Sequence, residues 1–168
     1  MPRELPVPKN VKDLFDELLG RPVTVGPADP MRAPDLHAQP LSCLYVDDSL
    51  TLRAIIAMDI KLAAYSGAAL GLVPATAAET SIEEKELSET IAENVTEVCN
   101  IMSSMLNHEG EARVKVHQTY LPGQMPPGDA IGYMLAFGRR LDLTVDVQGY
   151  GAGKIWVTLA KNWAPRSR

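Results

Sequence analysis

Two polar residues one helical turn apart are the first candidates for chemistry in this sequence. Glu97 and Asn100 enclose Val98 and Cys99 in a stretch with helical periodicity. At about 100° per residue, one side of this helix collects the apolar residues Ile91, Val95, Val98, Met102, Met105 and Leu106, and the other side collects Glu93, Glu97, Asn100 and Ser104. We therefore expect Glu97 and Asn100 to be exposed side by side. An acid and an amide at this spacing also occur on ordinary solvated helices, so the spacing alone does not decide between a functional and a structural interpretation.

A pair of carboxylates, Asp47-Asp48, follows an apolar strand candidate. In receiver domains such a pair holds Mg²⁺ beside a phosphorylated aspartate. A receiver begins with this strand, whereas about 40 residues precede it here, and a predicted long helix occupies the places where a receiver needs its phosphoacceptor aspartate and its lysine. We interpret Asp47 and Asp48 as residues of a hairpin turn, and we expect them to bind no divalent metal.

The cysteines, the histidines and a glycine-rich segment predict no further reactive or metal site. Cys99 has no His nearby in the sequence and lies beside the apolar stripe, so we interpret it as a buried structural thiol. Two cysteines and three widely spaced histidines do not match the usual zinc ligand patterns. Gly149-Tyr-Gly-Ala-Gly-Lys154 lacks the Gly-Lys-Ser/Thr of a phosphate-binding loop and precedes a strand, so a hairpin turn is predicted.

The candidate pair requires a regular helix to position it, and the sequence predicts one of roughly 25 residues. Ser81 and Glu84 form a capping box that would start it. No glycine or proline interrupts the chain from there to about Leu106. Residues 75–80 before it are predicted to be a linker.

Strand and helix patterns on both sides predict the rest of the domain. A hairpin over 41–46 and 50–58 precedes a helix over 60–72 with Asp59 as its N-cap, and strands over 113–120, 141–148 and 154–160 accompany a short helix over 129–137. Hairpins predominate over strand–helix–strand crossovers. We therefore predict an α+β fold with a mainly antiparallel sheet, on which the long helix and a second helix pack.

The first 40 residues hold eight of the thirteen prolines. A helix over 10–19 with Asn10 as its N-cap, an edge strand over 22–25 and a loop over 26–40 are predicted there. We divide the chain into a Pro-rich segment over 1–40 that is part of the domain or wraps it, a domain over 41–160, and a polar tail over 161–168.

Composition narrows the functional classes. The chain has 168 residues, of which 46% are hydrophobic and 22% charged, as in a single globular domain. A net charge of −5 without a basic cluster argues against nucleic-acid binding. Since no apolar run has the length of a transmembrane helix and the first residues do not resemble a signal peptide, we expect a cytoplasmic protein without a membrane partner.

The segment Leu87–Met102 resembles the signature helix of the CheX/CheC/FliY chemotaxis phosphatases. Their pattern is Ser or Asp, three residues, Glu, two residues and Asn, with a proline a little over twenty residues further on. Glu97-Val-Cys-Asn100 matches the core of this pattern, and Pro122 stands near the expected distance. The order of hairpin, helix, motif helix and final strands over 41–160 is also similar to CheX, so the resemblance implies a CheX/CheC-like fold.

The resemblance implies a function as well. The implied function is a phosphatase that accelerates the dephosphorylation of a phosphoaspartyl response regulator of the CheY type. Asn100 would orient the attacking water, Glu97 would pair with the active-site Lys of the partner, and Glu93 and Ser104 would contact the partner. No cofactor of its own is implied, because the Mg²⁺ belongs to the receiver. A homodimer is also implied as possible.

A second interpretation stays open beside the phosphatase. It is a non-catalytic binding module of the same fold that docks a receiver or a flagellar component, because fold alone does not give activity. Glu97 and Asn100 favour the phosphatase. Position 93 is Glu where the pattern has Ser or Asp, and Cys99 stands where a small residue is usual, which leaves room for the binding module.

A weak internal similarity bears on the number of sites. Asn10–Asp16 can be laid over Asn94–Asn100, which hints at two related halves. The first copy reads Asp13-Leu-Phe-Asp16 and lacks the Glu-x-x-Asn core. We therefore expect one site, as in CheX, rather than the two of CheC.

Overall fold

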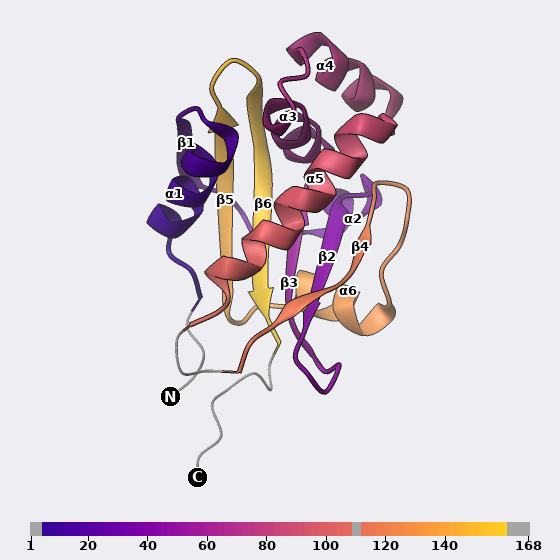
Figure 1. Ribbon diagram of the computed structural model, residues 1–168. Helices are drawn as coiled ribbons and strands as arrows, with labels where there is room; N and C mark the ends of the chain where they lie inside the picture. Colours follow the sequence, from indigo (N-terminus) through magenta and orange to yellow (C-terminus); the bar gives the residue numbers. More distant parts are fainter. Residues whose placement is uncertain (1–4, 109–111, 161–168) are drawn as a thin grey trace.

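The computed structural model describes residues 5–108 and 112–160 (Figure 1). They form a six-stranded sheet in the order β1-β5-β6-β3-β2-β4, in which every neighbouring pair is antiparallel. The strands are β1 (Val23–Pro27), β2 (Leu41–Val46), β3 (Leu52–Met58), β4 (Lys115–Tyr120), β5 (Arg140–Val147) and β6 (Gly151–Leu159). The helices are α1 (Pro8–Leu19), α2 (Ala33–His37), α3 (Ile60–Leu70), α4 (Ala75–Glu84), α5 (Glu89–Met102) and α6 (Gly128–Leu135). The predicted α+β class with an antiparallel sheet is confirmed.

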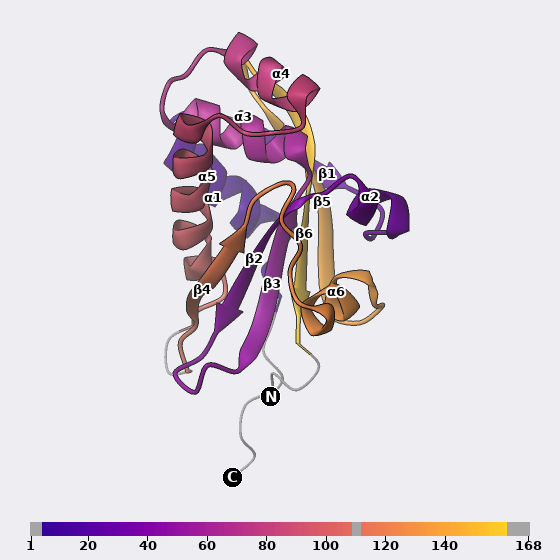
Figure 2. The same cartoon turned by 90° about the vertical axis from the view of Figure 1, so that its right-hand side faces the viewer.

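Helices cover both faces of the sheet, with α1, α3 and α5 on one face and α2 and α6 on the other (Figure 2). In β3, Ala54, Ile56 and Met58 belong to the larger core under α3 and α5, while Ile55 and Ala57 belong to the smaller core. Because both faces are buried, the central strands are continuous apolar runs instead of alternating ones. None of the helices in the described residues is long and apolar enough to cross a membrane.

The prediction of one long helix starting at Ser81 is wrong. Lys85 adopts the left-handed conformation with φ of 58° and ends α4. The Ser88 hydroxyl caps the separate helix α5 by accepting from the Ile91 N–H at 3.3 Å, and Ser88 N–H donates to the Ser81 hydroxyl at 3.2 Å. Residues 75–80, predicted to be a linker, form the first part of α4. Neither a glycine nor a proline marks the break, because a lysine takes the strained position.

The Pro-rich segment forms part of the domain wherever it is described. Helix α1 begins at Pro8, earlier than predicted, because Asn10 accepts a hydrogen bond from Val7 N–H at 2.8 Å from the third helical position instead of capping the helix. Its apolar side is buried in the larger core, and β1 pairs with β5 as an edge strand. The predicted loop over 26–40 contains the short helix α2. The predicted tail over 161–168 lies outside the described residues.

A buried ion pair fastens α6 to the second face of the sheet. The Arg140 guanidinium donates to Asp142 at 2.9 Å and to the carbonyl oxygens of Met134 and Ala136 at 3.0 and 2.7 Å. The side chains of Arg140 and Asp142 are 7% and 9% exposed. The bidentate guanidinium thereby satisfies the last carbonyl groups of α6, which have no partner inside the helix.

Helices α3 and α5 are in close contact at Gly67. A Cβ at this position would lie 2.6 Å from the Ile91 carbonyl oxygen and 3.0 Å from Ile91 Cγ2. Asn94 reaches across the same contact and donates from Nδ2 to the Gly67 carbonyl oxygen at 2.9 Å. The distance between the two helices therefore depends on the absence of a side chain at Gly67.

Replacement of this glycine tests the contact. We expect Gly67→Ala to lower the free energy of unfolding by about 1–3 kcal/mol in urea denaturation, because the new methyl group meets backbone atoms that cannot move independently. Gly132→Ala in α6 is the matched control, since nothing lies within 4 Å of a Cβ there, and we expect it to be neutral or stabilising by up to about 1 kcal/mol. Equal effects of the two substitutions would contradict the close packing of α5 on α3.

Candidate functional site

The outer face of α5 carries the residues singled out in the sequence. Glu93, Glu97 and Asn100 are exposed on α5, and Ser104 is exposed on the 3-10 turn η1 (Ser103–Met105) that follows. The expected exposure of Glu97 and Asn100 on one helix is confirmed. Within the described residues neither side chain forms a hydrogen bond or an ion pair with the protein. Both side chains are therefore available to a partner.

This face is acidic. Helix α5 and η1 contain Glu89, Glu93 and Glu97 but no lysine or arginine, and all three glutamates are exposed. Residues four apart lie above one another on a helix, so the three carboxylates form a row that ends at Asn100. A protein that binds along this row has to present positive charge to it.

A buried hydrogen bond fixes the helix at the point where Asn100 projects. Tyr45 on β2 is fully buried, and its hydroxyl donates to the carbonyl oxygen of Cys99 at 2.7 Å. Burial raises the pKa of the Tyr45 phenol well above its ordinary value, so the hydroxyl stays a neutral donor. The residue directly before Asn100 is thereby tied to the sheet, while Ser103 N–H donates to the Asn100 carbonyl oxygen and tightens the helix end.

The sequence did not reveal the two side chains that anchor α5. Asn94 holds α5 to α3 by its hydrogen bond to Gly67. In the sequence, the only indication of this contact is that Asn94 lies between the apolar and the polar side of the helix. Tyr45 and Cys99 are 54 residues apart, and no sequence pattern connects them. Such contacts depend on the topology, which brings β2 beneath α5.

Cys99 faces the core, as expected. Its thiol interacts with the Cys43 thiol, and both cysteines are buried. The neighbouring Cys43 sulfur and burial both penalise a negative charge and raise the pKa of the Cys99 thiol well above its ordinary value. Because the thiolate is the nucleophilic form, Cys99 is suited to packing and not to attack on a substrate.

The acidic pair on α1 has a structural role. Asp16 accepts hydrogen bonds from Val23 N–H at 2.7 Å and from the Lys12 ammonium at 2.6 Å, and these bonds lower the pKa of its carboxyl group. Asp13 pairs with Lys9 at 2.5 Å. Asp16 thus closes the turn from α1 into β1, and the single site on α5 stays a prediction.

Asp47 is engaged within the hairpin turn between β2 and β3. Its carboxylate accepts hydrogen bonds from Ser49 N–H, Thr51 N–H and Arg53 Nε at 2.9, 3.1 and 2.8 Å. Burial alone would raise the pKa of this carboxyl group, but the three donors outweigh it and hold the pKa below its ordinary value. Asp48 is exposed. No group of three or more His, Cys, Asp or Glu side chains in the described ranges is arranged to hold a metal ion.

Solved structures share this architecture at low sequence identity. FliY from Thermotoga maritima aligns with a TM-score of 0.55 and 13% identity, over 90% of this chain and 83% of FliY. The CheX-CheY-BeF3-Mg²⁺ complex from Borrelia burgdorferi aligns with a TM-score of 0.56 and 13% identity, over 89% of this chain and 92% of the matched chain. This chain has the CheC/CheX/FliY fold. The FliM-SpeE complex from H. pylori also matches it, with a TM-score of 0.60 and 7% identity, over 90% of this chain and 80% of the matched chain.

The resemblance inferred from the motif and the order of elements is thus confirmed at the level of the fold. The sequence itself matches no protein-family model, and no curated protein matches it. The roles of Glu97, Asn100, Glu93 and Ser104 rest on the motif and on their placement along α5, and they stay predictions.

The hairpin interpretation of Asp47 and Asp48 predicts the absence of a metal site. We expect isothermal titration with MgCl₂ to detect no binding at micromolar concentration, because the Asp47 carboxylate is already occupied by three donors. Asp48→Ala should give the same flat titration as the parent protein. Tight binding that is lost in Asp48→Ala would instead support a receiver-like acidic site.

The anchor at Tyr45 predicts a defined loss of stability. Tyr45→Phe removes the hydroxyl that satisfies the buried Cys99 carbonyl group, so we expect the free energy of unfolding to fall by about 1–2 kcal/mol. Tyr120→Phe is the matched control, because the Tyr120 hydroxyl has no hydrogen-bond partner among the described residues. Urea denaturation of both variants measures the difference, and identical midpoints would show that the Tyr45 hydrogen bond does not stabilise the fold.

Proposed function

We propose that this protein accelerates hydrolysis of the aspartyl phosphate of a CheY-type receiver through Asn100 and Glu97. The observation that carries the proposal is the placement of these two side chains. Both are exposed and unpaired in the described part of the chain, and they lie one turn apart on α5. Hydrogen bonds of Tyr45 and Asn94 hold the inner side of this helix in place. The fold shared with a complex that contains CheX and CheY supports a receiver as the class of partner.

The role proposed for Asn100 is to orient a water molecule. In the reaction, water attacks phosphorus in line with the bond to the receiver aspartate, that P–O bond breaks, and inorganic phosphate and a free carboxylate result. The side-chain amide of Asn100 enters the receiver site and accepts a hydrogen bond from the attacking water. Since no covalent intermediate forms on this protein, positioning supplies the rate acceleration. The Mg²⁺ that accompanies the phosphoryl group belongs to the receiver.

The role proposed for Glu97 is to anchor the complex. Its carboxylate pairs with the lysine of the receiver active site, and Glu93 and Ser104 contact the partner on either side along the helix. An ion pair that is desolvated at an interface contributes to both orientation and affinity. The row of carboxylates without a lysine or arginine on α5 and η1 fits such a cationic partner group.

The short Asn side chain makes the rigidity of α5 important. A misplacement of about 1 Å can reduce the rate of a reaction that depends on orientation by about 10²-fold. The hydrogen bonds of Asn94 to the Gly67 carbonyl, just before the motif, and of Tyr45 to the Cys99 carbonyl, within it, limit such displacement. Sites built on regular, well-packed elements are more precise than sites on loops.

The alternative is a binding module without hydrolysis. The same fold occurs in a complex that contains FliM and SpeE, which favours binding to a receiver or a flagellar component as a second candidate. Two departures from the pattern agree with it, Glu93 in place of Ser or Asp and Cys99 in place of a small residue. In this alternative Asn100 and Glu97 contribute to affinity but not to the rate of phosphate loss.

Substitution of the two residues separates the candidates. Decay of acetyl-phosphate-labelled CheY-type receivers from the source organism is measured at varied concentrations of this protein, beside a binding titration with the same receivers carrying BeF₃⁻. We expect Asn100→Ala to lower turnover by about 10²-fold with a small change in affinity. Glu97→Ala should weaken binding at least tenfold and lower turnover as well.

Glu83→Ala controls for the loss of a surface charge, because Glu83 is exposed on α4, outside the acidic row of α5, and it should change turnover less than threefold. If Asn100→Ala accelerates the decay of the phosphoreceiver as much as the parent protein does, Asn100 is not the water-orienting residue. Binding of a receiver by the parent protein without faster decay would establish the binding module.

A further inference from the structure

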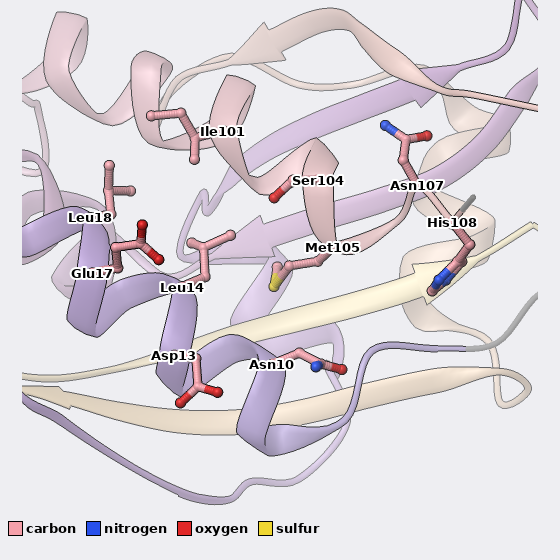
Figure 3. A pocket seen from close by; sticks show the side chains of 10 residues that line it. All are labelled: Asn10, Asp13, Leu14, Glu17, Leu18, Ile101, Ser104, Met105, Asn107 and His108. Carbon is pink, nitrogen blue, oxygen red and sulfur yellow. The ribbon is translucent and has the colours of Figure 1, made fainter.

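An open groove of about 680 Å³ lies between α1 and the C-terminal end of α5 (Figure 3). Leu14 and Leu18 on α1 form one wall, and Ile101 and Met105 on α5 and η1 form the opposite wall. Leu14, Leu18 and Ile101 are half-buried, so they offer apolar surface without being sealed in the core. Apolar walls with polar residues at their edge are the usual arrangement of a protein–protein contact.

The rim of the groove is acidic. Asp13 and Glu17 line it, and none of its lining residues in the described ranges is a lysine or an arginine. Asp13 pairs with Lys9, whereas Glu17 is exposed and has no partner among the described residues. The uncompensated negative charge at the rim is therefore that of Glu17, beside the apolar wall formed by Leu18.

The groove borders the candidate site. Ser104, four residues after Asn100, lines the groove on the α5 side. A specific interface buries about 800 Å² on each partner and involves some 20–30 residues a side. The exposed residues of α5 are too few to supply this area. A partner that engages Asn100 and Glu97 has to contact neighbouring surface, and the groove is a concave, partly apolar surface that continues from Asn100.

We propose that this groove is the second half of the docking surface and takes a basic, partly apolar segment of the same receiver that Glu97 and Asn100 engage. The proposal rests on the function proposed above. Apolar side chains of the segment pack between Leu14, Leu18 and Ile101, and a lysine or arginine of the segment pairs with Glu17. Glu17 is then a residue that selects among receivers, because rim charges mainly affect partner choice and association rate.

Hydrogen exchange locates the contact directly. The full chain is measured alone and with each CheY-type receiver of the source organism activated by BeF₃⁻ and Mg²⁺. We expect slower exchange in the peptides that cover α1 as well as in those that cover α5 and η1. Peptides that cover α4, whose exposed residues do not line the groove, should be unchanged.

Charge reversal tests the role of Glu17. We expect Glu17→Lys to weaken binding of the activated receiver by about fivefold to tenfold at low salt and to reduce the salt dependence of binding. The turnover of phosphoreceiver at saturation should be unchanged, since Glu17 is outside the reacting group. Glu83→Lys on α4 carries the same change in charge at another exposed helical position and should bind like the parent protein.

The outcomes distinguish this proposal from the proposed function. Protection of α5 and faster receiver decay without protection of α1 would overturn the groove as a docking surface and leave the phosphatase standing. If neither α1 nor α5 is protected and the decay of the phosphoreceiver is unchanged, both the groove proposal and the proposed phosphatase are wrong. Protection of α1 in the free protein that disappears on dilution to the monomer would assign the groove to a second copy of this chain and also overturn the proposal.

Discussion

The close packing of α5 on α3 at Gly67 is the contact on which the candidate site depends. Ile91 packs directly against Gly67, and Asn94 donates a hydrogen bond to the Gly67 carbonyl oxygen across the same contact. Two residues beyond Glu97, the buried Tyr45 hydroxyl donates a hydrogen bond to the carbonyl oxygen of Cys99. These anchors use the inner side of α5 only. The outer side of α5 takes no part in these contacts, and it carries the acidic row and Asn100.

Four of the side chains whose pKa values are shifted have structural roles away from the exposed face of α5. The pKa values of Tyr45 and Cys99 are raised strongly, but both side chains are in the core. The pKa values of Asp16 and Asp47 are lowered, and both carboxylates close turns. Enzymes that abstract or donate protons need titratable groups tuned at the reacting centre. The proposed function requires no such group on this chain, because the receiver would supply the reacting groups and the metal.

Local patterns predicted most of the fold, and they failed where a tertiary contact overrode them. Hairpin residues, the Asp59 cap and the alternation in β5 are local signals, and the corresponding elements are present. The break between α4 and α5 was missed because Lys85 takes a left-handed conformation that usually signals glycine. On the candidate site, the spacing of Glu97 and Asn100 fixed their shared face. The contributions of Tyr45 and Asn94 could not be predicted, since they depend on how distant elements meet.

The relation between fold and function in this protein follows from what each residue contributes. Identities of 7–13% with proteins of the same fold show that this architecture does not require close sequence similarity. Asn is a poorer helix former than Ala by a few tenths of a kcal/mol, and the Asn100 side chain gains no compensating contact in the described part of the chain. Local physics therefore gives no reason for an asparagine at this position. A contact made only in a complex would supply one, and the same argument applies to the unpaired carboxylates of Glu97 on α5 and Glu17 on α1.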